Sequence, residues 1–482
     1  MNKSLPLLLA IAATGCTMGP DFERPAAPPP QSGYASDGGT RAVLGEGPEA
    51  EWWRAFGSPR LDDLVARAIA GNHSLAASRA TLAKARERIA AVSGRRLPQV
   101  TADARGEYQK FNLQAFGLGD RFGSGGIGNP EFDLYTVGAG VTYDLDLFGR
   151  NRRALEQAAA EAQAQMRETQ TAHLVIAGRV VAQVLAIAAL NDRIATERKL
   201  IAEDERNVSL TESRRRAGDG TTVEVLTAQG QLESDRAGIP ALEWQLAEAR
   251  AMLAVLLGIS PAELGDTGFS LADFTLPARI PVAVPSELVR KRPDILEAEA
   301  RLHAATAAIG VATAELYPDV TLGASVTQST SEAEKVFDTK YNAFDLFAGL
   351  TAPIFDGGTR RAEKRGAEAE ARAIAAQYRQ VVVEAFGQVS TLLSALESDS
   401  RELAARKRSQ DVAARSLHLS RRSFEVGYSG ILQVVDASRT SQRAELALIE
   451  TRTRQYQNVA RLYVATAGGW SLEEDGLPGT GG

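Results

Sequence analysis

The chain has 482 residues, of which 44 % are hydrophobic and 24 % charged, and its formal net charge is −6. This modest negative charge argues against a nucleic-acid partner, because nucleic acids select basic surfaces. The four histidines, His73, His173, His303 and His418, are far apart and accompany no metal or nucleotide motif, so neither a metal site nor a cofactor is expected. No nucleophile, base or metal constellation indicates an enzyme.

Residues 1–15 have the layout of a secretory signal peptide, with an apolar run from Leu5 to Ala13. Cys16 follows small residues and is the only cysteine. We interpret it as a lipid-attachment site that carries diacylglycerol and an N-acyl chain such as palmitate; the alternative is an incidental residue of a discarded signal. Residues 16–50 would then be a lipid-anchored linker. Thr17 stands where Asp would favour inner-membrane retention, so the anchor belongs to the outer membrane of a Gram-negative bacterium.

Alternating polar and apolar residues predict four strands, at about 98–111, 132–148, 318–330 and 344–356. No apolar stretch of the mature chain approaches the ~20 residues of a membrane-spanning helix, so a membrane crossing requires a closed barrel of strands. A half-buried sheet of a soluble protein would alternate in the same way, but the export signal favours lipid outside and water inside. Four strands cannot close a barrel, which must therefore be shared between chains.

The loops that join the strands of each pair are polar, Gly-rich or charged, as expected outside the cell. They are Gly117–Pro130 and Gln328–Asn342.

Long helices are predicted at about 150–258 and 359–468. In the first, apolar residues recur every seven positions from Val180 through Ile187 and Ile194, which indicates a coiled-coil seam. The run before the first turn would reach roughly 100 Å as a continuous helix. Gly218 and Gly427 mark the turns at which each helical hairpin reverses, and these exposed tips are where a partner protein would dock.

The chain is an internal duplication. Residues 218–228 return as residues 427–437, and the sequence after Leu97 returns after Tyr317. The first repeat spans residues 51–265 and the second residues 266–470, followed by a flexible tail at 471–482. The predicted fold is mainly α with a transmembrane β-barrel portion, in which each repeat contains a helix, a β-hairpin and a long helical hairpin.

These features resemble the outer-membrane factors of tripartite efflux pumps, the TolC/OprM family, and in particular the lipoprotein branch that serves resistance-nodulation-division transporters. The motifs that carry the resemblance are Gly19–Phe22 with Arg24–Pro25, Asp144–Gly149, Arg292–Ile295, Pro353–Gly358, Val434–Arg439 and Gly468–Trp470.

The resemblance implies a homotrimer with a shared twelve-strand barrel in the outer membrane and an α-helical coiled-coil tunnel in the periplasm. It implies two protein partners, a periplasmic adaptor and an inner-membrane transporter, and an exit duct for drugs or other small toxic compounds. A lipid-anchored coiled-coil or adhesin stalk is the alternative function.

The resemblance also places a periplasmic gate at Leu432 and Asp436, with Arg439 one turn along. Leu432 and Asp436 are four residues apart and share one helix face, so three copies would stack an apolar ring on an acidic one. Alternatively, Leu432 is a packing residue and Asp436 a surface charge or helix cap. The first-repeat equivalents, Val223 and Thr227, carry no charge, so the acidic ring would have three members.

Overall fold

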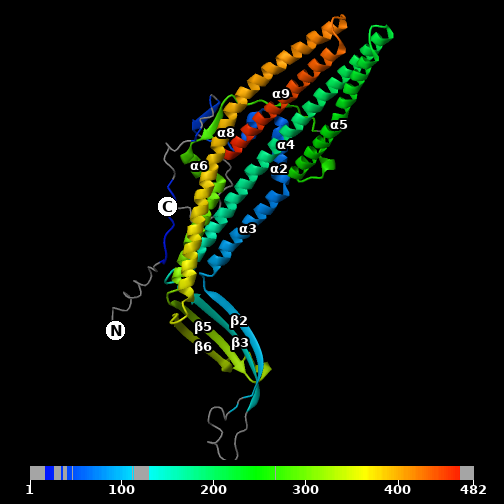
Figure 1. Cartoon of the computed structure of the whole chain (residues 1–482). Helices are drawn as coiled ribbons and strands as arrows, with labels where there is room; N and C mark the ends of the chain where they lie inside the picture. The colour runs from blue at the N-terminus through cyan, green and yellow to red at the C-terminus, as the bar shows by residue number, and fades with distance from the viewer. Residues whose placement is uncertain are drawn as a thin grey trace, which may run out of the picture.

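The computed structural model of the chain describes residues 17–26, 34–35, 39, 41–45, 47–110, 112, 130–265 and 267–466. The predicted signal peptide, Cys16, the tail at 471–482 and the motif Gly468–Trp470 lie outside the described residues, as does nearly all of the loop 117–130. The four longest helices run side by side at one end of the molecule, and a curved sheet forms the other end (Figure 1).

Both repeats have the predicted order of elements. The first contains η1 (Trp52–Phe56), α2 (Pro59–Gly71), α3 (His73–Gly94), β2 (Gln99–Lys110), β3 (Glu131–Asp144), α4 (Arg150–Arg216) and α5 (Thr222–Leu257). The second contains α6 (Pro285–Lys291), α7 (Pro293–Ala314), β5 (Asp319–Thr330), β6 (Asn342–Thr351), α8 (Thr359–Glu425) and α9 (Ile431–Thr466). Short 3₁₀ turns are η3 (Pro261–Glu263), η4 (Leu271–Asp273), η5 (Ala333–Lys335) and η6 (Thr339–Tyr341). The predicted mainly helical fold with a strand pair in each repeat is confirmed.

The four long strands form one antiparallel sheet in the order β2-β3-β5-β6, so the two repeats meet between β3 and β5. The register aligns the apolar sides of both hairpins. One cross-strand row contains Val100, Val141, Ala324 and Leu346. The adjacent row, on the opposite face, contains Thr101, Gly140, Ser325 and Asp345. The sheet therefore has one continuous apolar face and one mostly polar face.

Two predicted strands are too long. β3 ends at Asp144 and not at 148, and β6 ends at Thr351 and not at 356. The alternation of polar and apolar residues continues beyond these ends, but the aspartates there form hydrogen bonds with the following helices. The Asp146 carboxylate accepts the backbone N–H groups of Asn151 and Arg152 at 2.9 and 3.0 Å. Asp356 likewise accepts the N–H of Arg360 at 3.1 Å, so both aspartates cap a helix N-terminus.

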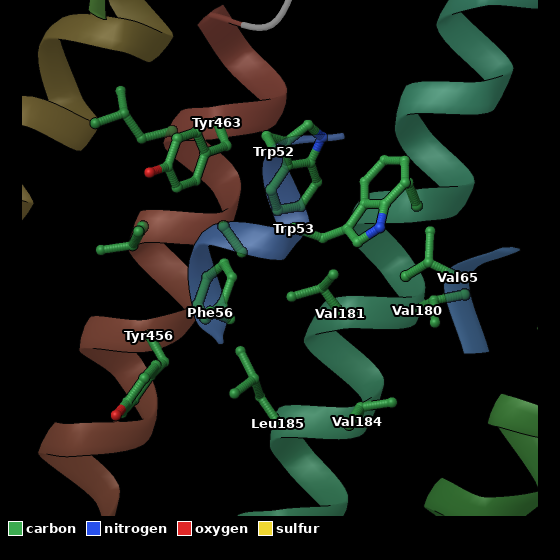
Figure 2. Packing of buried hydrophobic residues seen from close by; sticks show 14 of the residues in the cluster. Trp52, Trp53, Phe56, Val65, Val180, Val181, Val184, Leu185, Tyr456 and Tyr463 are labelled. Carbon is green, nitrogen blue, oxygen red and sulfur yellow. The ribbon is translucent and has the colours of Figure 1, made fainter. Parts of the chain in front are cut away.

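A short parallel sheet of β1 (Ala42–Gly45) and β4 (Ile280–Ala283) is an element that the sequence pattern does not predict. Beside it lies an aromatic core that joins the start of the first repeat to α4 and α9. Trp52 stacks on Tyr463 with ring centroids 5.5 Å apart, and Phe56 lies beside Val181 and Leu185 of α4 (Figure 2). This core joins the middle of α4 to the C-terminal part of α9.

From the sequence, no stretch of the mature chain is expected to be long and apolar enough to span a membrane. By the criteria of length and composition this expectation is wrong. α4 contains an 18-residue window of mean hydropathy 1.9, but 61 % of that window is buried inside the chain. The seam residues Val180 and Ile187 lie in the same core. The apolar window is therefore explained by the packing of α4 against the other helices.

Candidate functional site

The tips of the two helical hairpins have the same backbone construction. Gly218 has φ +85° and Gly427 has φ +81°, in the left-handed region that favours glycine. In each case the next residue closes the helix end: Asp219 N–H donates to Arg214 O, and Tyr428 N–H donates to Ser423 O, both at 2.9 Å. An added Cβ at either glycine would meet no atom within 4 Å among the described residues. The two glycines are therefore required by backbone conformation and not by packing.

The hairpin tips of the two repeats are packed together. Phe424 of α8 lies in an apolar cluster with Ala228 of α5 and Val434 of α9. The guanidinium of Arg214, from α4, lies 4.8 Å from the centroid of the Phe424 ring. Contacts between all four long helices thus hold the tips as one unit.

The predicted gate residues lie on the exposed side of α9, next to this cluster. Ile431, Val434 and Val435 face the interior, whereas Leu432 is 67 % exposed and Asp436 is exposed. In the described part of the chain the Asp436 carboxylate has no hydrogen-bond or ion-pair partner. Leu432 is therefore not a packing residue within its own chain, and Asp436 does not cap a helix.

Arg439 is positioned by the other repeat. Its Nε donates to the Gln231 Oε1 of α5 at 2.7 Å, and the Gln231 Nε2 donates to the Asp235 Oδ2 at 2.8 Å. Gln231 is buried. Sequence reasoning identified Arg439 but missed Gln231 and Asp235, since polar residues of a long helix are usually solvated.

The residues that follow Cys16 are docked where the sheet meets the helices. Met18 N–H donates to Phe148 O at 3.2 Å, and the buried guanidinium of Arg153 donates to the Asp21 carboxylate at 2.7 Å. The Phe22 ring stacks on that of His303 with centroids 4.4 Å apart. This part of the predicted linker is therefore packed against α4 and α7, and His303 has a structural role.

Comparisons with known proteins cover both repeats. A family profile described as “Outer membrane efflux protein” matches residues 64–259 and 284–468. The chain is 30 % identical to the pyoverdine export outer membrane protein OpmQ of Pseudomonas putida, over 98 % of this chain and 97 % of that protein. It is 26 % identical to the cation efflux system protein CusC of Escherichia coli O6:H1, over 97 % of this chain and 99 % of that protein. The structure matches the solved outer-membrane channel OprN with a TM-score of 0.85 at 29 % identity, covering 94 % of this chain and all of that one.

Proposed function

Since the chain belongs to the outer membrane efflux protein family and is an efflux channel of the outer membrane, we propose that it works as a homotrimeric, lipid-anchored exit duct. Its partners in this proposal are a periplasmic adaptor and an inner-membrane transporter of the resistance-nodulation-division type. The relatives OpmQ and CusC are named for different cargoes, pyoverdine and cations. A passive duct accounts for this difference, because selection of cargo can be left to the transporter.

The proposal of a trimer is supported by the two edges of the sheet. β2 and β6 form these edges, and neither has a second partner strand in the described part of the chain. Unpaired backbone groups are not tolerated in hydrocarbon. Three copies would pair β6 of one chain with β2 of the next and close twelve strands. Native mass measurement in detergent should therefore give a trimer, and a monomer as the only species would contradict the proposal.

The exit-duct function is tested by conductance. The purified full-length protein should form single channels in planar bilayers, because a closed barrel continued by a helical tunnel encloses water. The alternative, a coiled-coil stalk with a small barrel as anchor, predicts no conductance. Absence of channels at every voltage and pH would reject the duct.

The lipid anchor on Cys16 is supported by the docking of the following residues. Thr17 lies against Gly149, where an added Cβ would come within 3.0 Å of Thr17, so the chain enters beside the junction of sheet and helices. An acyl chain at this level would reach the inner leaflet next to the barrel. Labelled fatty acid should enter the wild type and not the Cys16→Ser variant, and no label in the wild type would exclude lipidation.

A further inference from the structure

A buried polar seam runs along α4 close to the proposed gate. Glu197, Asp204 and Thr211 are spaced by seven residues, and all are buried. Residues at this spacing share one side of a coiled-coil helix. Glu197 Oε2 accepts a hydrogen bond from Gln442 Nε2 of α9 at 2.8 Å, so this side of α4 faces α9 as well as α5. Carboxyl groups are rarely placed on a seam unless they are paired.

Asp204 is the more deeply buried of the two acidic residues, with only 3 % of its surface exposed. Its Oδ1 accepts a long hydrogen bond from Asn207 Nδ2 at 3.4 Å. Its Oδ2 is buried and receives no hydrogen bond from any N–H or hydroxyl donor in the described part of the chain. The neighbouring polar group is the carboxyl of Asp235, on α5. Two carboxyl groups can form a hydrogen bond with each other only when one of them holds a proton.

The surroundings of Asp204 favour a protonated carboxyl group at this position. Burial, followed by the hydrogen bond and negative charge of Asp235, raises the pKa of Asp204 to about 7. Arg236, the neighbouring cation on α5, is held by Glu205 and Glu233 at 2.7 and 2.8 Å. Glu203 is paired with Arg421 of α8 and adds further negative charge near Asp204. Burial also raises the pKa of Glu197.

The acid pair is connected to the gate helix by side chains. Asp235 accepts from Gln231, and Gln231 accepts from Arg439 of α9, three residues beyond Asp436. The connection Asp204–Asp235–Gln231–Arg439 crosses from α4 through α5 to α9. All of its members except Arg439 are buried or half-buried, so a change at the pair cannot be absorbed by solvent alone.

We propose that Asp204 keeps a proton and donates it to the Asp235 carboxylate, so that the two residues form a pH-sensitive latch that holds α4, α5 and α9 in the arrangement seen here. Loss of the proton to bulk water leaves two like charges in one buried site. Their repulsion separates α4 from α5 and withdraws the Asp235–Gln231 support from Arg439, which frees α9 to move. This latch rests on the proposed function, because it controls the gate of the proposed duct.

The direction of the pH effect follows from linkage. A carboxyl whose pKa is raised in the packed state binds its proton more tightly there than in an opened, solvated state. The packed state is therefore most favoured below about pH 4 and loses its advantage as the pH rises toward about 7. The open population should increase by at most about tenfold per pH unit in this interval and level off above about pH 7.

The test is single-channel recording of the full-length trimer at a series of pH values from about 5 to about 8. Wild-type opening should rise with pH. Asp204→Asn, which cannot lose a proton, should keep the low-pH behaviour throughout. Glu248→Gln is the matched control, because it removes an exposed carboxylate of α5 that takes no part in the ion pairs of Arg236, so it should retain the pH response. Channels whose opening does not depend on pH, or a pH response that survives Asp204→Asn, would overturn the latch.

A second variant and a spectroscopic measurement test the latch if Asp204→Asn fails to fold. Asp235→Asn reaches the same pair from α5 and should also abolish the pH response. Infrared absorption of a protonated carboxyl should persist in the wild type at about pH 6 and be lost by about pH 8, and its absence at the lower pH would overturn the proton kept by Asp204. A protein that conducts without a pH response contradicts only the latch, whereas a protein that conducts at no pH contradicts the duct.

Discussion

At the scale of single residues, the aspartates at the sheet–helix junction do more than end a strand. Asp144 Oδ2 accepts from Arg150 Nη2 at 2.8 Å, and the same guanidinium group lies 3.1 Å from Asp319 Oδ2 of the second repeat. Asp146 caps α4 and adopts φ +47°, an unusual value for a residue other than glycine. Polar contacts therefore join the two repeats at the level where strands give way to helices.

Asp146→Ala should destabilise the protein by about 1 kcal/mol, because it removes the acceptor for two backbone N–H groups of α4. The left-handed φ adds to the cost of Ala. The thermal midpoint of the trimer measures the loss. Asp146→Asn is the matched control, since its side-chain oxygen can still cap and Asn tolerates this conformation. Equal midpoints for the Ala and Asn variants would show that the cap contributes nothing.

Some site residues could be predicted from the sequence and others could not, for physical reasons. Gly218 and Gly427 were found because only a helix reversal explains glycine at the same place in both repeats. The cap Asp146 was missed because its polar side continues the alternation of β3. Asp204 was missed because a carboxylate in a long helix normally faces solvent, and only the three-dimensional packing of α4 with α5 and α9 buries it.

At the scale of elements, the sheet has two chemically different faces, and matched substitutions can distinguish them. Leu346 is 74 % exposed on the apolar face in the middle of β6 and pairs with Ala324, whereas Ser325 lies on the polar face and pairs with Asp345. Leu346→Arg should cost roughly 2 to 4 kcal/mol, the range for a cation near the midplane of a bilayer, and Ser325→Arg much less. Denaturant unfolding from lipid vesicles gives both values. Equal costs would mean that the apolar face does not contact lipid.

The hairpin tips allow a test of docking that leaves packing unchanged. Gly427→Val places a β-branched residue at φ +81°, at a position where an added Cβ meets no described atom within 4 Å, so the change acts mainly on the local tip conformation. We expect trimer and protein level to be maintained while adaptor pull-down and efflux are lost. Gly427→Asn is the control, because Asn adopts this conformation readily. Normal efflux with normal adaptor pull-down in the Val variant would place the contact elsewhere.

The elements themselves were predictable because long periodic patterns outweigh local propensity. Repeats of seven and of two residues located the long helices and the strands. The parallel pair β1–β4 could not be found in this way, because each strand has only four residues, and β1 lies in the predicted linker whereas β4 lies in the second repeat. Such short strands form because the aromatic core brings the segments together.

At the scale of the whole molecule, the duplication produces quasi-equivalent hairpins with unequal chemistry at their tips. Leu432 and Asp436 correspond to Val223 and Thr227 of the first repeat, and Thr227 donates its hydroxyl proton to Val223 O within its own helix. A trimer would therefore present three carboxylates from the second repeats and none from the equivalent positions of the first. The constriction proposed at the tunnel end is acidic in only half of its quasi-equivalent positions.

The proposed gate at Leu432 and Asp436 can be tested in the assembled trimer. Threefold symmetry would bring the exposed Leu432 and Asp436 of three chains toward one axis, where Leu432 limits the width and the carboxylates repel anions. Truncating both residues to Ala should raise single-channel conductance, weaken cation selectivity and admit large antibiotics into cells. Leu432→Ala alone should act mainly on conductance and Asp436→Ala mainly on selectivity, with little change in stability because both side chains are exposed. If the double variant left conductance and ion selectivity unchanged, these residues would face neighbouring helices and the constriction would lie at another level.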